Sequence, residues 1–496
     1  MTQEEELIQL REEKRLFREQ NSLQKQLIEQ QQERIGLLEK QNSLQQQQIA
    51  LLSEQVKALQ ERQAKDSHNS HLPPSSDRFV RQPRSLRKKS GKPSGGQKGH
   101  EGHSLHLSET PDEVIRHPVD SCAHCQHDLR EVASLQQERR QVIDLPPQRL
   151  LIQEHQAEQK CCPRCQQITS AVFPSHVLSP VQYGPRLGAM AVYLIQQQLL
   201  PYERASEIIA DLLGPHLSVG TLVELVARCA HLLAPVEQWI KDQLCKAQVL
   251  HQDETGLYVQ GKRQWMHVSA TSRLTHYQVH AKRGQDALQA IGILPDFEGV
   301  SVHDGWKSYL RYGCVHALCN AHHLRELTGI EEMYHQPWAS EMKQLLLDIK
   351  AAVEQARADG RSHLHPDEWH DWKTRYTDLL LLGEQANPVV EEAVPKKKGR
   401  RKQHPARNLL DRLTLYRDAV LRFAVNFAVP FDNNQAERDL RMVKVQQKIS
   451  GCFRSQAGAE AFCRIRGYLS SLRKQGLHPL TALEATLLGH PLFPAF

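Results

Sequence analysis

Three acidic residues lie where the side chains of a predicted sheet could converge. Asp253 ends one predicted strand, and Asp304 ends another, 51 residues further along the chain. Glu437 comes 133 residues after Asp304, in the first turn of a predicted helix. Carboxylates in these positions can meet at one edge of a mixed sheet, where their hard oxygen atoms suit Mg²⁺ or Mn²⁺. Two such ions can activate an attacking oxygen and stabilise a leaving oxygen at a phosphodiester.

The spacing of these acids also fits simpler roles. A chain with 57 acidic residues contains many such triples, and Glu437 could pair with Arg441 one helical turn further on. Glu254 follows Asp253 directly, and consecutive strand residues point to opposite faces. We therefore expect only one of these two carboxylates to reach the site.

A second group of residues consists of four cysteines in two C-x-x-C pairs: Cys122, Cys125, Cys162 and Cys165. Four thiolates in two such turns can close tetrahedrally on one Zn²⁺. They leave no open position on the metal, so we expect this zinc to be structural. Two unrelated reduced pairs are the alternative, and Cys161, His124 and His127 are rival ligands.

A further group of metal-ligating residue types could be taken for a second zinc site: Cys314, His316, Cys319, His322 and His323. Histidines on a helix more often make ordinary hydrogen bonds, which we favour here. The eleven cysteines of this long chain indicate metal ligation in a reducing compartment more than a disulfide scaffold.

Positive charge is concentrated in two segments rich in Gly, Pro, Lys and Arg. The first contains Arg78, Arg81, Arg84, Arg87, Lys88, Lys89, Lys92 and Lys98, and the second contains Lys396, Lys397, Lys398, Arg400, Arg401 and Lys402. Their fourteen charges exceed the formal net charge of +6, so the rest of the chain is net acidic. Such segments suit a polyanion, whereas two solvated linkers are the simpler alternative.

The N-terminal region favours one long helix, because residues 1 to 65 contain no proline and a single glycine, Gly36. A heptad register places Leu7, Ile28, Ile35, Ile49 and Val56 at one seam position and Leu10, Phe17, Leu38, Leu52 and Leu59 at the other. This pattern is typical of a coiled coil. We therefore expect oligomerisation through this helix, with a monomeric arm as the alternative.

Helical spacing of apolar residues returns between residues 185 and 235. Gly214-Pro215 breaks one predicted helix, and Ser218 is a good N-cap for the next. The pattern fits a helix-turn-helix and any small helical bundle equally well.

From residue 249 the pattern changes to strands, predicted at 249–251, 257–259, 265–268, 277–279 and 299–303. A helix is predicted over 285–293. Beyond Tyr309 nearly everything is predicted to be helical, apart from the basic break at 395–408. Strands with interspersed helices indicate a mixed-sheet α/β layer.

Four short motifs carry a family resemblance. They are His251-Gln-Asp-Glu-Thr255, Val302-His-Asp-Gly-Trp306, Cys319-Asn-Ala-His322 and Asn433-Asn-Gln-Ala-Glu-Arg438. In this order they resemble the insertion sequence 66 family of transposases, and the layout of the whole chain is similar to that family. The resemblance implies an RNase H-like DDE catalytic core in which Asp253, Asp304 and Glu437 bind two Mg²⁺ or Mn²⁺ ions.

Basic residues around Glu437 are candidates for contact with DNA: Arg438, Arg441, Lys444, Lys448 and Arg454. Arg464, Arg466 and Arg473 extend this series, and Arg84, Lys88 and Lys89 of the first basic segment join it. A solvated helix face is the alternative for any single residue. For the set, a surface that contacts the DNA backbone is favoured, and its affinity should fall steeply with salt.

The expected protein is a transposase that binds transposon ends and target DNA and catalyses strand cleavage and strand transfer. An RNase H-like nuclease or resolvase is the alternative within the same chemistry, and a non-enzymatic DNA-binding regulator is the alternative from another class. No apolar run approaches the ~18 residues that span a bilayer, and the first residues are acidic. We expect a cytoplasmic, nucleoid-associated protein, and the resemblance implies accessory proteins as partners.

These predictions divide the chain as follows: a coiled-coil helix at 1–65, a basic disordered linker at 66–110, a zinc-binding domain at 111–178, a helix-turn-helix-like DNA-binding domain at 179–240, the first part of the catalytic core at 241–345, a helical insertion with a basic loop at 346–409, the second part of the core at 410–475, and a C-terminal tail at 476–496.

Overall fold

The computed structural model describes residues 3–66, 68–70, 105–146, 148–174, 176–177, 179–389 and 403–496. The two basic segments predicted from the sequence, with Arg84, Lys88 and Lys89, lie outside the described residues. The chain forms two compact units, one made of Met1–Pro83 with Cys319–Phe427 and the other of Arg84–Leu318 with Ala428–Phe496.

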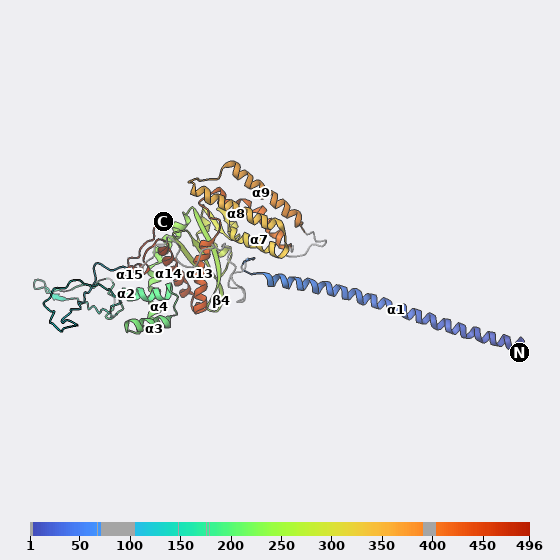
Figure 1. Ribbon diagram of the computed structural model, residues 1–496, viewed down its shortest axis with the longest axis horizontal. Helices are drawn as coiled ribbons and strands as arrows, with labels where there is room; N and C mark the ends of the chain where they lie inside the picture. Colours follow the sequence, from blue (N-terminus) through green and yellow to red (C-terminus); the bar gives the residue numbers. More distant parts are fainter. Residues whose placement is uncertain are drawn as a thin grey trace. The chain divides into compact units, whose positions relative to one another are not determined.

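The described part of the first unit is helical (Figure 1). Its helices are α1 (Gln3–Ala64), α7 (Asn320–Tyr334), α8 (Pro337–Ala358), α9 (Pro366–Ala386), α10 (Pro405–Leu415), α11 (Arg417–Val420) and α12 (Arg422–Val425). The single long helix predicted for the N-terminal region is confirmed by α1. Its seam residues from Leu10 to Leu59 are between 51 and 64 % exposed, so they contribute little to the core of one chain.

The helices α7 to α10 pack together, and their buried residues include Leu327, Leu345 and Leu409. Tyr376 on α9 donates a hydrogen bond of 3.0 Å to the carbonyl of Leu413 on α10. Sequence periodicity therefore predicts this helical layer correctly.

The second unit contains a five-stranded mixed sheet in the order β5-β4-β3-β6-β7. Its strands are β3 (Val249–Val259), β4 (Lys262–Ala270), β5 (Thr275–His280), β6 (Val300–His303) and β7 (Val315–Leu318). The pairs β3/β4 and β4/β5 are antiparallel, whereas β3/β6 and β6/β7 are parallel. A smaller antiparallel hairpin pairs β1 (Gln159–Cys161) with β2 (Ile168–Ser170).

Two sequence predictions for the sheet are wrong in detail. The segments 249–251 and 257–259 belong to one continuous strand, because the polar residues between them still pair with β4. Asp253 therefore lies inside β3 and not at the end of a strand, as was predicted. Residues 315–318 form β7, although helix was predicted beyond Tyr309. Four residues that lead directly into α7 carry too little alternation to reveal an edge strand.

The helical elements of the second unit are α2 (Pro185–Val192), the π-helix η2 (Tyr193–Gln197), α3 (Tyr202–Leu213), α4 (Val219–Leu232), α5 (Ala234–Cys245), α6 (Gln285–Ile291), the 3₁₀ turns η3 (Leu294–Asp296) and η4 (Tyr309–Arg311), α13 (Asn434–Ser450), α14 (Gln456–Lys474) and α15 (Pro479–Leu487). The predicted cap is confirmed, since the Ser218 hydroxyl accepts from the backbone N–H of Thr221 at 3.1 Å.

Two helices bury one face of the sheet. Leu440 of α13 and Phe462 of α14 pack against Leu257, Met266 and Tyr277 of β3 to β5. The helices α2 to α5 share a second core with α14 and α15. Within the described residues no single helix is long and apolar enough to cross a bilayer, and the bent pair α4–α5 meets the criteria of length and composition with 46° between its helices.

Candidate active site

Asp253 and Asp304 each lie two residues beyond the last pair of the parallel ladder between β3 and β6, His251 with Val302. Val249 of β3 pairs with Val300 of β6, an offset of 51 residues that continues along the ladder. The same offset separates Asp253 from Asp304, which directly follows the end of β6. The backbone N–H of Trp306 donates to Oδ1 of Asp304 at 2.9 Å, and this fixes the carboxylate at the end of the strand. The intervening Gly305 has a φ of +89°, a conformation that favours glycine.

Asn433 positions the helix that carries the third acid. Its Nδ2 donates to the carbonyl of Gln252 at 2.7 Å, and its Oδ1 lies 2.8 Å from Nδ1 of His251. These contacts join the start of α13 to β3, one residue before Asp253. The backbone N–H of Glu437 donates to the carbonyl of Asn433 at 3.3 Å, so Glu437 lies one turn along the same helix face.

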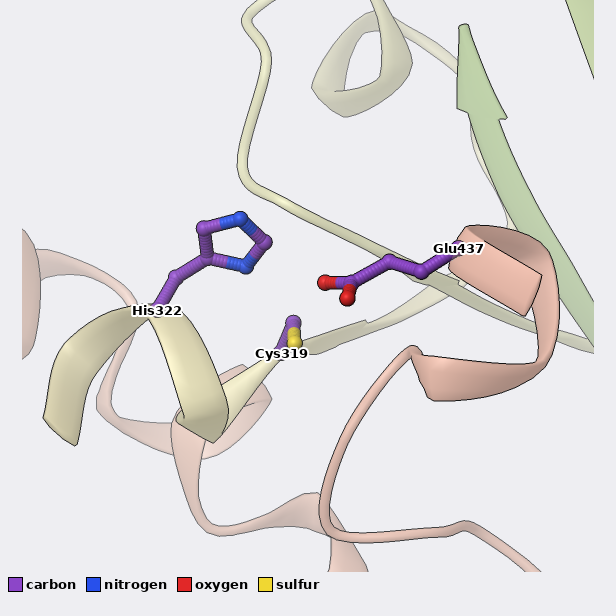
Figure 2. A group of neighbouring side chains, drawn as sticks. All are labelled: Cys319, His322 and Glu437. Carbon is purple, nitrogen blue, oxygen red and sulfur yellow. The ribbon is translucent and has the colours of Figure 1, made fainter. Parts of the chain in front are cut away.

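The positive end of the helix dipole favours a carboxylate in this first turn. Figure 2 shows Glu437 on the first turn of α13. It also draws Cys319 and His322, which lie at the start of α7.

The charges of the three acids act on one another. Burial raises the pKa of Asp253 well above its ordinary value, and the negative charges of Glu254, Asp304 and Glu437 raise it further. The three predicted acids therefore share an excess of negative charge that a divalent cation would neutralise. In the part of the chain that the structure describes, their oxygen atoms do not all lie within 4.8 Å of one another. They form an acidic neighbourhood rather than a closed ligand set.

Glu254 is a fourth acid in this neighbourhood that was not included in the predicted site. Its side chain is 2 % exposed, and Oε1 accepts from Nε of Arg283 at 2.7 Å. The hydroxyl of Tyr309 donates to its other oxygen. Burial and the charge of Asp304 raise the pKa of Glu254, whereas Tyr309 and Arg283 oppose that rise. The charge of Asp304 therefore raises the pKa of both Asp253 and Glu254, but Glu254 already has a cationic partner in Arg283.

The cations predicted to contact DNA fall into two groups. Arg438, Arg441, Lys448 and Arg454 are exposed. Lys444 is half-buried, and its Nζ donates to the carbonyl of Gly256 at 3.0 Å. Burial lowers the pKa of this amine.

Two arginines of the extended series have structural partners instead. Arg466 is buried, and its Nη1 donates to the carbonyls of Gln196 and Gln197 at 3.3 and 3.2 Å. These carbonyls belong to the π-helix η2. Arg464 binds Glu237 at 2.7 Å. Extending the DNA-contact series to Arg466 was wrong, because a basic residue in a sequence carries no sign of its burial.

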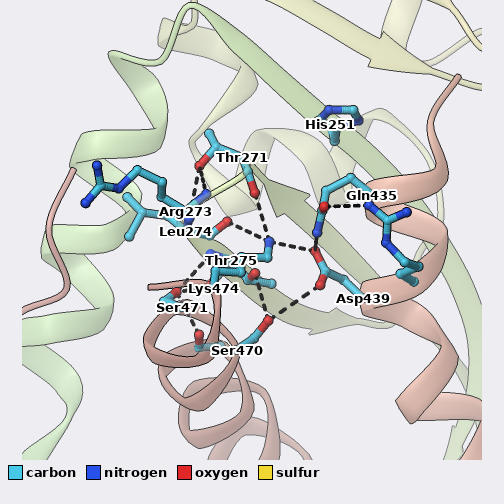
Figure 3. Close-up of polar contacts among 12 residues, drawn as sticks. His251, Thr271, Arg273, Leu274, Thr275, Gln435, Asp439, Ser470, Ser471 and Lys474 are labelled. Carbon is cyan, nitrogen blue, oxygen red and sulfur yellow. Dashed lines mark hydrogen bonds and ion pairs between the residues drawn. The ribbon is translucent and has the colours of Figure 1, made fainter. Parts of the chain in front are cut away.

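A buried ion pair joins α13 to α14 (Figure 3). Nζ of Lys474 lies 2.9 Å from Oδ2 of Asp439 and donates to the carbonyls of Thr271 and Leu274. Asp439 also accepts from Nε2 of Gln435 at 3.0 Å. This network fixes the helix of Glu437 to the turn between β4 and β5.

The two C-x-x-C pairs have the same local structure. The backbone N–H of Cys122 donates to the carbonyl of His127 at 2.8 Å, and that of Cys162 donates to the carbonyl of Gln167 at 2.9 Å. The residue after each pair has a positive φ, 63° at Gln126 and 58° at Gln166. Two equivalent turns of this kind suit a shared role for the four cysteines.

Each turn favours thiolate at its first cysteine. The backbone N–H groups of Cys125 and His124, followed by the Cys125 thiol, lower the pKa of Cys122. Those of Cys165 and Arg164, followed by the Cys165 thiol, lower the pKa of Cys162. Across the described residues, the four sulfur atoms do not form one group with all distances within 4.8 Å.

Two histidines of the alternative second zinc site make hydrogen bonds. Nδ1 of His316 lies 3.1 Å from Nε2 of His303, and its Nε2 lies 3.1 Å from the carbonyl of Tyr312. Nδ1 of His323 lies 3.0 Å from Oδ1 of Asn320. All three contacts are of the ordinary kind that we favour for histidines in this segment.

Comparison with known families defines the class of protein. A family model described as "Transposase IS66 family" matches residues 180–461, more than half of the chain. A second model, "zinc-finger binding domain of transposase IS66", matches residues 120–166 and includes all four cysteines of the two pairs. A third, a family of unknown function (DUF6444), matches residues 5–106. No curated protein matches the chain significantly. The chain belongs to the IS66 family of transposases, and its zinc-finger domain supports a structural zinc.

Proposed function

We propose that this protein is a DDE transposase that binds transposon ends and catalyses metal-dependent cleavage and strand transfer with Asp253, Asp304 and Glu437. The observation that carries the proposal is the 51-residue offset of the parallel ladder between β3 and β6, which equals the spacing of the two aspartates, together with the effect of Asp304 and Glu437 on the pKa of Asp253. Membership of the IS66 family supports the same reaction. The mixed five-stranded sheet supports the RNase H-like fold that the resemblance implies.

The residues at this edge of the sheet fit hard divalent cations. Asp253, Asp304 and Glu437 would hold two Mg²⁺ or Mn²⁺ ions through oxygen atoms, which these cations prefer. When bound, the ions supply Lewis-acid activation of water and stabilise charge at the phosphate. The chain itself fixes the acids through the parallel register of β3 and β6 and through the contacts of Asn433.

The remaining parts of the chain have proposed roles that follow from their chemistry. The cysteines Cys122, Cys125, Cys162 and Cys165 would hold one structural Zn²⁺ in the domain at 111–178. The helices α2 to α5 would contribute to DNA binding, and residues 346–409, which include α9, would form a helical insertion between the two parts of the catalytic core. Exposed Arg438, Arg441, Lys448 and Arg454 would contact the DNA backbone.

The exposed seam of α1 supports self-association. Leucines, isoleucines and Phe17 repeat along it at heptad positions and remain exposed. A second copy of the same helix would bury both seams in a coiled coil. Accessory proteins and association with the nucleoid would follow from activity on DNA.

The proposal is tested with purified protein and DNA that carries the ends of the element, with and without Mg²⁺. The transposase reaction predicts cleavage that requires Mg²⁺, followed by joining of a pre-cut end to target DNA. Cleavage without joining would instead identify a nuclease or resolvase. Binding of the ends with no cleavage at any Mg²⁺ concentration would identify a DNA-binding regulator and overturn the proposal.

A further inference from the structure

Four side chains near the acidic neighbourhood contact one another in a row in which arginine and tryptophan alternate: Arg263, Trp265, Arg283 and Trp306. Cζ of Arg263 lies 4.8 Å from the ring centroid of Trp265, and Cζ of Arg283 lies 4.9 Å from the same ring. Cζ of Arg283 is also 3.8 Å from the ring centroid of Trp306. We call these four residues the Arg–Trp stack. Each contact falls within the range of a cation–π interaction.

The backbone brings the stack together from separate segments. Arg263 and Trp265 lie two residues apart on β4, so they share one face of the sheet. Gly256 pairs with Trp265 across β3 and β4. The guanidinium of Arg263 lies over Gly256, since a Cβ atom placed there would be in ordinary contact with Nε and Nη2 of Arg263 at 3.4 Å.

The stack is fixed to the acidic residues at two points. Nε of Arg283 donates to Glu254 at 2.7 Å, and the backbone N–H of Trp306 donates to Asp304 at 2.9 Å. Trp306 lies two residues after Asp304 and, like Gly305 before it, belongs to the turn that ends β6. The stack therefore adjoins Asp304, one of the three proposed catalytic carboxylates, and the neighbouring Glu254.

The same side chains remain accessible. Trp306 is 37 % exposed, the Arg283 side chain is 32 % exposed, and Arg263 is exposed. A tryptophan that served only packing would gain more from full burial. Proteins bind single-stranded nucleic acid with aromatic rings that lie between cationic side chains, because bases stack on the rings and the cations attract phosphates. A paired duplex hides its base faces, so the stack favours unpaired nucleotides.

We propose that the Arg–Trp stack binds unpaired nucleotides of the DNA strand next to the catalytic carboxylates. This inference rests on the proposed transposase function and adds a substrate feature to it. Stacking is tolerant of sequence, so the stack would recognise a frayed or splayed end rather than a particular base. Arg283 would act as a positioning residue, held by Glu254 and covering the ring of Trp306.

The test measures binding by the full-length protein in the absence of Mg²⁺, so that no cleavage is required. The probes are a blunt DNA hairpin and the same hairpin with an unpaired oligothymidine tail, both labelled with a fluorophore. We expect the wild type to prefer the tailed hairpin. Trp306→Ala should weaken binding of the tailed hairpin by about tenfold, as expected for loss of one base–aromatic stack, and leave the blunt hairpin nearly unchanged.

Three further variants separate stacking from folding. Trp306→Phe should restore most of the preference for the tail, because it keeps an aromatic face. Arg283→Lys keeps the charge but loses the planar guanidinium, and it should reduce the preference. Trp369→Ala is the matched control, since Trp369 on α9 also lies under a cation, with Nζ of Lys373 5.6 Å from its ring centroid. This control should bind both hairpins as the wild type does.

Two results would overturn the inference: equal affinity of the wild type for both hairpins, or equal loss of both in Trp306→Ala with an unchanged melting temperature. Failure of the proposed function is a separate outcome. A protein that prefers the tail but never cleaves transposon ends in Mg²⁺ would contradict the transposase reaction and leave the binding result intact.

Discussion

Two acids on α13 have opposite surroundings. Asp439 is 9 % exposed and lies against Nζ of Lys474, with a further hydrogen bond from Gln435. Glu437, two residues earlier, adds its negative charge to a neighbourhood in which the pKa of Asp253 is already raised by burial. Asp439 is paired with a cation, whereas the charge of Glu437 is one of several that raise the pKa of Asp253. The difference separates an acid that stabilises the fold from one that we propose as a metal ligand.

The largest expected effect comes from removing one charge of the acidic neighbourhood. Asp304→Asn should lower Mg²⁺-dependent cleavage of transposon ends by roughly a thousandfold or more, because a metal ligand supplies several kcal/mol of transition-state stabilisation. The melting temperature should stay the same or rise, since a repulsive charge is lost. Asp286→Asn is the matched control on α6, where Asp286 is exposed and pairs with Lys282. Wild-type cleavage by Asp304→Asn would exclude the triad.

Breaking the ion pair between Lys474 and Asp439 should mainly lower the stability of the protein. Lys474→Met leaves Asp439 buried without its cation and should lower the free energy of unfolding by about 3 to 5 kcal/mol, measured by urea denaturation. The double variant Lys474→Met with Asp439→Leu should recover much of that loss, because no buried charge remains. If Lys474→Met is as stable as the wild type, the pair does not hold α13 in the way we describe.

The buried His276 of β5 sharpens the comparison, because it stays uncharged although Oε1 of Glu237 lies 3.8 Å from its Nε2. Burial, aided by Lys241 and Arg464, lowers the pKa of His276 to about 3, against about 6.5 in an unfolded chain. The unfolded chain binds more protons between these values, so stability should fall as pH decreases from about 6.5 towards about 3. The slope from this residue is at most about 1.4 kcal/mol per pH unit. His276→Gln should reduce the slope of the free energy of unfolding against pH in this range. An unchanged slope would contradict this account.

The smallest effect concerns two cations of α13. Arg441 is exposed, whereas Nζ of Lys444 donates to the carbonyl of Gly256. Arg441→Ala should weaken DNA binding and reduce the slope of log affinity against log salt by about 0.9, the value for one lost phosphate contact. Lys444→Ala should leave that slope unchanged and lower thermal stability. The reverse outcome would show that the anchored lysine, and not the exposed arginine, contacts DNA.

Local patterns in the sequence predicted much of this molecule. The heptads of α1, the cap at Ser218 and the position of Glu437 in a first helical turn depend on neighbours within a few residues. The end of β6, which Asp304 follows directly, is visible for the same reason, whereas the predicted strand end at Asp253 was wrong because β3 continues to Val259.

What the sequence could not reveal depends on contacts between distant segments. Glu254 meets Arg283 and Tyr309, which lie 29 and 55 residues away. Nothing in the spacing of Trp265, Arg283 and Trp306 indicates that they stack. The burial of Arg466 is equally impossible to predict from the sequence. The carbonyls that accept its hydrogen bonds belong to a π-helix about 270 residues earlier in the chain.

Calorimetric titration of the zinc-loaded protein with Mn²⁺ tests the central claim most directly, because it needs neither DNA nor cleavage. The account predicts that the wild type and Asp286→Asn bind Mn²⁺ equally well, and that Asp253→Asn, Asp304→Asn and Glu437→Gln each lose most of that binding. Undiminished Mn²⁺ binding by the three triad variants, with their folds intact, would contradict the claim that these carboxylates form one metal site.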